Sequence, residues 1–458
     1  MSSKVWEVMK SNNKTICFLQ EYSVPLIAGV FCSLLFANLA PHWYHELVHS
    51  PWLGLFGHHD SGHHGLSEHM QTMHFWVNEV FMVLFFGIAA KEITESCLPG
   101  GALNPMSKAV NPLLGTIGGI VGPVAVFILL NSMIGQGEWA KGWGIPTATD
   151  IALAWLAART IFGKGHPAIA FLLLLAVADD AIGLAIIAIA YPNPELPTIW
   201  ANALWILPGM ATAFLFRKIG IQSWIPYILV AGAFSWWGLY SAHLHPALGL
   251  VFIVPFLPAA KRDRGLFVNA PEQDASNEHS EKYSTLDNFE HDLKLPVDFG
   301  LFFFAFANAG VAFSGISNLT WIILLSLIAG KMLGITLFSW GATWFGFKLP
   351  EGMSVKHLVV ASCVAGIGLT VALFVSGQAF VDSGIQGAAK MGSLFSACAF
   401  LVAWILAKSL GVGPSKKEQD EEWFDATASD AVNFDTNQSV LPDEIVREPD
   451  EELVESGI

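Results

Sequence analysis

Two adjacent aspartates, Asp179 and Asp180, lie in the middle of an apolar stretch that runs over 168–191. A charged side chain at the centre of a membrane helix costs about 2.5–3.5 kcal/mol even on a lenient insertion scale, so such residues usually serve a function. Neighbouring helix positions point about 100° apart, so the two carboxylates can address different neighbours. The pair predicts an ion-binding site inside a membrane. The alternative is that the acids lie in a loop.

A second apolar stretch, over 143–161, is interrupted near its start. Pro146 removes a backbone hydrogen-bond donor there, which favours a break in the helix. Carbonyls freed at a break, with the Thr149 hydroxyl and the Asp150 carboxylate, would form an oxygen-rich site suited to a small monovalent cation. The alternative is an ordinary helix start at which Asp150 is the N-cap.

Lys331 lies within a third apolar stretch, 319–342, too far from either end for its ammonium group to reach the surface easily. It therefore requires an acidic partner, for which Asp179 or Asp180 is the candidate, or it must be neutral. A buried ion pair with a purely structural role is the alternative.

The elements that carry these residues are predicted to be membrane helices. Of the 458 residues, 53% are hydrophobic and 13% are charged, whereas about a quarter are charged in a soluble domain. This composition excludes a disordered chain and fits poorly with a soluble enzyme. Apolar stretches of about the 20 residues that cross a bilayer predict twelve spans: 24–40, 72–91, 111–134, 143–161, 168–191, 198–216, 225–240, 244–258, 296–315, 319–342, 357–378 and 387–410.

The fourth and eleventh spans are the interrupted ones, and each is the middle member of a triplet (spans 3–5 and 10–12). The eleventh contains Gly366, Gly368 and Thr370; glycine says little by itself, because it is common where membrane helices pack closely. Paired interruptions at corresponding places indicate a binding site between inverted repeats. The sequence therefore predicts an all-α polytopic membrane protein with inverted repeats and two broken helices.

An even number of spans places both ends of the chain on one side of the membrane. If that side is cytoplasmic, 20 of the 23 Lys and Arg residues lie there, only Lys141 and Lys390 lie outside, and Lys331 is within the membrane. The positive-inside rule requires such a bias. The predicted organisation is a cytoplasmic segment 1–23, a membrane domain 24–410 with an external loop 41–74 and a cytoplasmic loop 259–295, and a cytoplasmic tail 411–458.

The formal net charge of −15 comes mostly from the tail, which has fourteen acidic and three basic residues from Lys416 onward. Acidic runs with few aromatic residues predict a solvated, disordered segment rather than a docking module. The five cysteines are scattered without paired spacing, so neither a disulfide framework nor a metal motif is predicted.

Nine of the fifteen histidines lie in the predicted external loop. Imidazole binds zinc and titrates near pH 6.5, so His58, His59, His63 and His64 are candidates for an external metal or pH-sensitive site. No cysteine or regular ligand spacing supports a specific metal site. A pH-sensitive contact between two copies of the chain is the hypothesis that this loop favours.

Five motifs occur in one order: Gly142–Asp150, Asp179-Asp180, Phe304–Gly310, Gly330-Lys331 and Gly366–Thr370. In order and spacing they resemble the NhaA family of sodium/proton antiporters over residues 20–410. The resemblance implies that the two broken helices cross within the membrane. It also implies a homodimer in the bacterial inner membrane with both termini cytoplasmic.

The resemblance assigns roles to individual residues. Asp180 matches the principal cation-binding aspartate, and Asp179 matches the partner of the lysine, Lys331. Thr149 and Asp150 match the polar pair at the crossing, where Asp150 and Lys331 compensate half-helix dipoles. Positions that the resemblance associates with pH sensing or cation access are Glu79, Glu92, Glu290 and His291.

The sequence departs from the family pattern at the cytoplasmic end. Residues 89–95 read Ala-Ala-Lys-Glu-Ile-Thr-Glu where Gly-Leu-Glu-Val-Lys-Arg-Glu is typical, and Lys294 stands where a second histidine is usual. Glu79 replaces a more usual aspartate. These differences bear on the pH dependence of activity and leave the core chemistry unchanged.

The implied activity is exchange of cytoplasmic Na⁺ or Li⁺ for external H⁺, for pH and sodium homeostasis, with cation and protons competing for buried aspartates. Two protons enter per sodium expelled, so the cycle is electrogenic. Lys331 either pairs with Asp179 or releases a proton when sodium binds. Neither a cofactor nor a nucleic-acid partner is implied.

Two other classes of protein also place charges inside the membrane. An intramembrane aspartyl protease needs aspartates that face each other from separate helices, whereas Asp179 and Asp180 are neighbours on one predicted helix. A sodium-coupled symporter for an organic acid needs cationic or amide groups around the anion, and Lys331 is the only base predicted to lie deep within the membrane rather than near a surface. The sequence therefore predicts a transporter rather than an enzyme.

Overall fold

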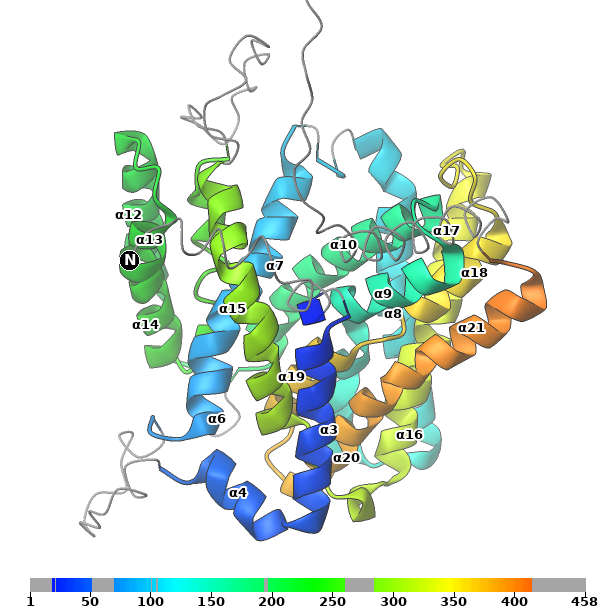
Figure 1. Cartoon of the computed structure of the whole chain (residues 1–458), viewed down its shortest axis with the longest axis horizontal. Coiled ribbons are helices and arrows are strands. Elements are labelled where there is room, and N and C mark those ends of the chain that lie inside the picture. Colours follow the sequence, from blue (N-terminus) through cyan, green and yellow to red (C-terminus); the bar gives the residue numbers. More distant parts are fainter. Residues whose placement is uncertain are drawn as a thin grey trace, which may run out of the picture. The chain divides into compact units, whose positions relative to one another are not determined.

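The computed structural model describes residues 19–20, 22–51, 70–99, 101–103, 106–192, 197–259 and 284–413. Within these ranges every regular element is a helix (Figure 1). The predicted acidic tail from residue 414 onward lies outside the described residues, as do His58, His59, His63 and His64.

Five described helices are long and apolar enough to cross a membrane: Met73–Cys97, Ala109–Ile134, Pro167–Ala190, Asn318–Trp344 and Ser383–Leu410. A bent pair, Val355–Val364 with Leu369–Ala379, is a sixth candidate, and its two halves meet at an angle of 48°. Val24–Leu39 and Ile151–Phe162 are shorter apolar helices. The chain is a multi-pass membrane protein.

The elements of the first part of the chain are α3 (Val24–Leu39), α4 (Pro41–His49), α6 (Met73–Phe75), η2 (Trp76–Phe81), α7 (Met82–Cys97), α8 (Met106–Ile134), η3 (Gly137–Thr147), α9 (Ile151–Phe162) and α10 (Pro167–Ala190). The middle part contains α11 (Trp200–Ala203), α12 (Ile206–Ile219), α13 (Trp224–Pro226), η4 (Tyr227–Gly232), α14 (Ala233–Ser241), η5 (Pro246–Leu248) and η6 (Val254–Phe256). The last part contains α15 (Thr285–Asn308), η7 (Phe313–Gly315), α16 (Asn318–Leu325), η8 (Ser326–Gly330), α17 (Lys331–Trp344), α18 (Val355–Val364), α19 (Leu369–Ala379), α20 (Ser383–Phe395), η9 (Ser396–Cys398) and α21 (Ala399–Leu410).

Two predicted spans differ from these helices. The stretch 244–258 forms turns and two short 3₁₀ segments, η5 and η6, because its prolines remove backbone donors that a continuous helix needs. The predicted span 296–315 is α15, which begins at Thr285 inside the predicted loop 259–295 and ends at Asn308. Its earlier start is stabilised by a capping box between Ser284 and Asp287.

The two ends of the helical bundle are distinguished by their contacts. At one end, called here the first face, α3 begins, α7 ends and α15 begins: Gln20 donates to Asp298 at 2.9 Å, and Lys91 of α7 pairs with Glu290 of α15. At the opposite end, the second face, α4 follows α3, and the Tyr44 hydroxyl donates to the Phe306 carbonyl at 2.6 Å.

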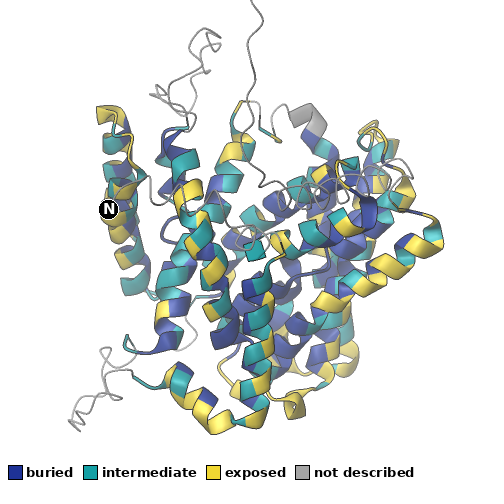
Figure 2. Ribbon diagram, in the orientation of Figure 1, coloured by how far each residue is buried: buried dark blue, intermediate teal, exposed yellow. Residues whose placement is uncertain are grey.

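The outer helices carry many exposed residues (Figure 2), and a large number of these are bulky apolar residues. On α3, Ile27, Phe31 and Leu39 are exposed by 50%, 66% and 75%, and they lie along one side of the helix. The opposite side packs against α15 so closely that a Cβ at Gly29 would lie 2.4 Å from the Phe302 carbonyl oxygen. This is the reverse of a soluble amphipathic helix, and it fits a helix that faces lipid.

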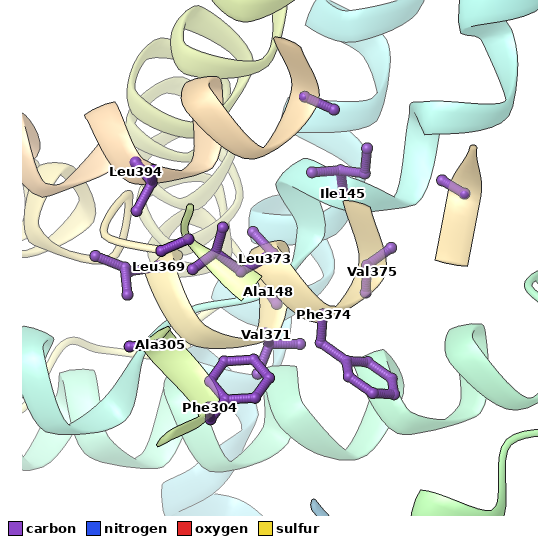
Figure 3. Packing of buried hydrophobic residues seen from close by; sticks show 14 of the residues in the cluster. Ile145, Ala148, Phe304, Ala305, Leu369, Val371, Leu373, Phe374, Val375 and Leu394 are labelled. Carbon is purple, nitrogen blue, oxygen red and sulfur yellow. The ribbon is translucent and has the colours of Figure 1, made fainter. Parts of the chain in front are cut away.

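The half-helix α19 lies inside the apolar core (Figure 3). Its residues from Leu369 to Phe374 are all at most 6% exposed, and they pack with Ile145 and Ala148 of the first broken helix and with Phe304 of α15. Polar groups in this part of the molecule are therefore shielded from water on most sides, which raises the cost of leaving any of them unpaired.

Candidate ion-binding site

The two broken helices meet at their interruptions. The first is η3 followed by α9, and the second is α18 followed by α19. The backbone N–H of Asp150 donates to the Ile367 carbonyl at 2.7 Å. Only glycine fits at 368, since a Cβ there would lie 2.9 Å from the Ala148 carbonyl oxygen. The segment after Pro146 is thus in direct contact with the segment that includes Gly366.

Asp150 caps both second halves at once. One carboxylate oxygen accepts from the Leu153 N–H at 3.1 Å, at the start of α9. The other accepts from the Thr370 N–H at 3.2 Å and from its hydroxyl at 2.9 Å, at the start of α19. A carboxylate between two helix N-termini is stabilised by both helix dipoles. Asp150 is therefore an N-cap, as one alternative predicted, and also lies at the crossing.

Lys331 lies beneath this crossing with a fully buried side chain. Its ammonium group donates to Asp179 Oδ2 at 2.5 Å and to Thr149 Oγ1 at 2.6 Å. Thr149 Oγ1 is 2.7 Å from the same Asp179 oxygen and 3.1 Å from the Ala365 carbonyl at the end of α18. A π-helical turn, η8, directly precedes Lys331; such turns often occur at functional sites. The lysine thus pairs with Asp179 and lies near a helix C-terminus.

Asp180 has different surroundings from Asp179. It lines a cavity of about 720 Å³ that also borders Thr149, Asp150 and Thr370, and that reaches Glu290 and Lys294 near the first face. Asp180 Oδ1 is shielded from solvent and has no hydrogen-bond partner among the described residues. It is therefore a carboxylate that is open to a cavity and has no donor to neutralise it.

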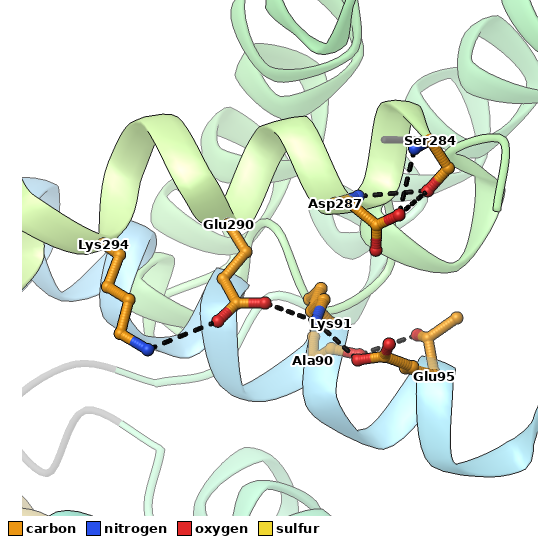
Figure 4. Close-up of polar contacts among 8 residues, drawn as sticks. Ala90, Lys91, Glu95, Ser284, Asp287, Glu290 and Lys294 are labelled. Atoms are coloured by element: carbon orange, nitrogen blue, oxygen red, sulfur yellow. Dashed lines mark hydrogen bonds and ion pairs between the residues drawn. The ribbon is translucent and has the colours of Figure 1, made fainter. Parts of the chain in front are cut away.

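Charged residues form a network at the first-face end of this cavity (Figure 4). Lys91 pairs with Glu95 at 2.5 Å and also with Glu290, which lies 3.7 Å from the Lys294 ammonium group. Among the residues predicted for pH sensing or cation access, Glu92 and Glu290 line the cavity. His291 is half-exposed beside Asp292 and is not among the lining residues.

Glu79 is not with the other predicted access residues. It lies on the π-helical turn η2, where its carbonyl accepts from the Trp236 indole at 2.7 Å, and it is not among the residues that line the cavity. Its Oε2 is buried without a hydrogen-bond partner in the described part of the chain. Glu79 therefore does not border the cavity that Asp180 lines.

Sequence reasoning missed several polar residues of this region. Asp298 and Gln20 also line the cavity, and an acid inside the predicted span 296–315 was the same signal that marked Asp180. Tyr191 is another: its hydroxyl accepts from the Gly144 N–H at 2.7 Å and donates to the Lys141 carbonyl at 2.8 Å, which fixes η3 to the end of α10. Lys390, predicted to lie outside, is buried in α20.

The described part of the predicted external loop carries a row of histidines. The rings of His45 and His49 are 4.8 Å apart, and those of His49 and His74 are 5.2 Å apart. Burial and the positive charges of His45 and Lys390 lower the pKa of His49 to about 4. His49 is therefore neutral above that pH, and within the described ranges no three metal-ligand side chains are grouped.

Buried carboxylates and one lysine at the meeting point of two broken membrane helices are the arrangement of an ion-coupled transporter. Residues 19–407 match the family described as Na⁺/H⁺ antiporter 1, and the chain belongs to that family.

Similar proteins share this assignment. The chain is 52% identical over 412 residues to the Na⁺/H⁺ antiporter NhaA of Desulfitobacterium hafniense, and the match covers 90% of this chain and 100% of that protein. It is 54% identical over 402 residues to the NhaA of Geobacter sulfurreducens, covering 87% and 98%. The NhaA of a Jannaschia species is 42% identical over 416 residues, covering 85% and 96%. The named activity of these relatives is that of transporters, not enzymes.

Proposed function

We propose that this protein exchanges cytoplasmic Na⁺, or Li⁺, for external H⁺ across the bacterial inner membrane, for pH and sodium homeostasis. Asp180 carries the proposal, because its carboxylate borders a cavity and has no hydrogen-bond donor among the described residues. A carboxylate in such a place must be neutralised by a bound proton or a bound cation. A site that accepts either, but not both together, exchanges one for the other.

The neighbouring groups suit this competition. Thr149, Asp150 and Thr370 border the same cavity and offer oxygen atoms to a cation held at Asp180. Asp179 is paired with Lys331, and we propose that cation binding weakens this pair. Two protons then enter for each Na⁺ expelled, and the cycle moves net charge. The titration of coupled groups of this kind belongs to the cluster and not to one residue.

The proposed topology is twelve spans with both ends of the chain cytoplasmic, so that the first face is the cytoplasmic one. The cavity at Asp180 reaches the network around Glu290, which fits a state open to the cytoplasm. Spans 3–5 and 10–12 are proposed inverted repeats, each with a broken middle helix. Alternating access would move one group of helices against the other around the site. A homodimer is part of the proposal and rests on the family resemblance.

Everted membrane vesicles with an acid interior test the activity. We expect NaCl and LiCl, but not KCl, to collapse the pH gradient when the wild-type protein is present. A pH gradient that stays unchanged when NaCl is added would contradict the proposed exchange. Making the vesicle potential more negative or more positive at constant pH gradient should change the rate, because the cycle is proposed to be electrogenic.

Replacing Asp180 tests the site. Asp180→Asn keeps the shape of the side chain but cannot ionise, so Na⁺-dependent proton movement in proteoliposomes should fall to the level of liposomes without protein. Asp292→Asn, on the exposed side of α15, is the matched control and should transport normally. Wild-type exchange by Asp180→Asn would refute the assignment.

A further inference from the structure

Two histidines meet at the first face, away from the ion-binding site. His166 directly precedes α10, the helix that bears Asp179 and Asp180, and His357 lies in the first turn of α18, the first half of the second broken helix. Their rings are 4.7 Å apart, and the Phe162 ring stacks on His166 at 5.3 Å. The loop before α18 also touches α10, since a Cβ at Gly352 would lie 3.4 Å from Pro167.

Each histidine accepts a hydrogen bond at the start of its helix. His166 Nδ1 accepts from the Ala168 N–H at 3.1 Å. His357 Nδ1 accepts from the Ser354 N–H at 3.1 Å and lies 2.7 Å from the Ser354 hydroxyl. An imidazole nitrogen can accept a hydrogen bond only while it carries no proton. Both caps therefore require the neutral ring with Nδ1 unprotonated.

We propose that His166 and His357 are positioning residues that fix the first-face ends of α10 and α18 to each other, and that they do so only when both rings are neutral. Protonation of Nδ1 removes the two caps, places positive charge at two helix N-termini and brings two like charges together. All three effects act in one direction. Acid at the first face therefore loosens the two helices on which Asp180 and the break at Gly366 depend.

Most of the charged groups on the elements around the pair are basic. They are Arg159 in the last turn of α9, Lys164 after α9, Lys348 and Glu351 before α18, Lys356 in α18, and Lys408 in α21. Five of these six groups are basic. Part of this charge is directed elsewhere: Arg159 lies over the Trp155 ring, Lys408 over the Trp404 ring, and Lys356 donates to the Leu410 carbonyl.

The decisive variant keeps the caps and removes the titration. In His166→Ser with His357→Gln, serine is a good N-cap and glutamine a good third residue of a capping box, and neither binds a proton in this range. We expect the midpoint of the acid limb of Na⁺-driven exchange to move at least about 0.5 pH unit lower than in the wild type. His42→Gln, an exposed histidine on α4 at the second face, is the control and should not move it.

A second variant separates the caps from the titration. His166→Ala with His357→Ala removes both caps at every pH, so exchange at alkaline pH should already be reduced, and acidification should cause no further fall through these two positions. An acid limb that is unchanged in the Ser/Gln variant overturns the proposal, and so does an alanine variant that behaves like the Ser/Gln variant.

The transport assay depends on the proposed function. A measurement that does not use transport therefore tests the histidine proposal separately. Amide hydrogen exchange of the purified protein at pH 8 and 5.5, with labelling times scaled for intrinsic exchange, should show lost protection over 166–175 and 354–363 in the wild type at pH 5.5. The Ser/Gln variant should keep that protection. Equal protection of the wild type at both pH values overturns the histidine proposal, whereas absence of Na⁺-driven exchange with this result intact overturns the proposed function alone.

Discussion

Asp179 and Asp180 are adjacent in the chain, yet they lie in different surroundings. Asp179 Oδ2 accepts from the Lys331 ammonium group and lies 2.7 Å from the Thr149 hydroxyl, and its side chain is fully buried. Asp180 borders the cavity, and its buried Oδ1 has no partner among the described residues. The difference teaches that one helix can hold a carboxylate paired with a lysine next to a carboxylate that borders a cavity, because adjacent positions point in different directions.

The largest effect on stability should come from breaking the paired side of this comparison. Asp179→Asn leaves the Lys331 ammonium group buried without an anion, which should cost about 3–5 kcal/mol of unfolding free energy. Asp180→Asn removes no observed hydrogen bond, so its stability should stay close to that of the wild type. Thermal and denaturant unfolding in detergent measure both.

The double variant sharpens that test. Asp179→Asn with Lys331→Met removes both charges and should recover most of the lost stability, since a buried ion pair contributes little relative to apolar residues of similar size. If Asp179→Asn proves as stable as Asp180→Asn, the two carboxylates do not differ in the way described.

A smaller effect is expected at the contact between the two breaks. Gly368→Ala places a Cβ 2.9 Å from the Ala148 carbonyl oxygen, and forcing atoms into a packed core costs about 1–3 kcal/mol. Gly341→Ala on α17 is the matched control, because a Cβ there meets no atom within 4 Å in the described structure. Equal melting temperatures for the two variants would show that the close contact between residues 368 and 148 is not needed for stability.

The smallest effect is expected in the network at the first face. Lys91 pairs with Glu290 and Glu95, whose side chains are 22% and 49% exposed. Ion pairs with partly exposed partners contribute about 1 kcal/mol or less, so Lys91→Met should destabilise far less than Asp179→Asn. The loss should shrink further in high salt, measured by unfolding at low and high ionic strength. If Lys91→Met lost as much unfolding free energy as Asp179→Asn, this network would contribute as much to stability as the buried ion pair does.

Much of the site followed from residue type and depth in an apolar stretch. Lys331 was expected to need an acid, because an unpaired ammonium group in hydrocarbon is costly, and it does pair with Asp179. Residues without that signal were missed. Tyr191 is an ordinary aromatic residue in sequence, and its role as a link depends on the fold bringing the end of α10 next to η3. Glu79, which the family resemblance associated with pH sensing or cation access, is not among the residues that line the cavity.

The fold shows the same division. Hydropathy located most of the helices, whereas the predicted span 244–258 is not a continuous helix, because its prolines limit it to turns and short 3₁₀ segments. It also placed the start of α15 too late, because the capping box at Ser284 is a local polar signal that an apolar window does not register.

By itself the sequence determined that the chain crosses a membrane and that acids and a lysine lie within it, because burial of apolar stretches depends on local composition. The family resemblance paired Asp179 with Lys331, but only the tertiary structure decided which oxygen of Asp179 meets the lysine, that Asp180 borders the cavity, and that Asp150 caps two helices at once. Those outcomes depend on contacts between residues as far apart as 150 and 370, and on helix orientation, which apolar patterning alone does not specify.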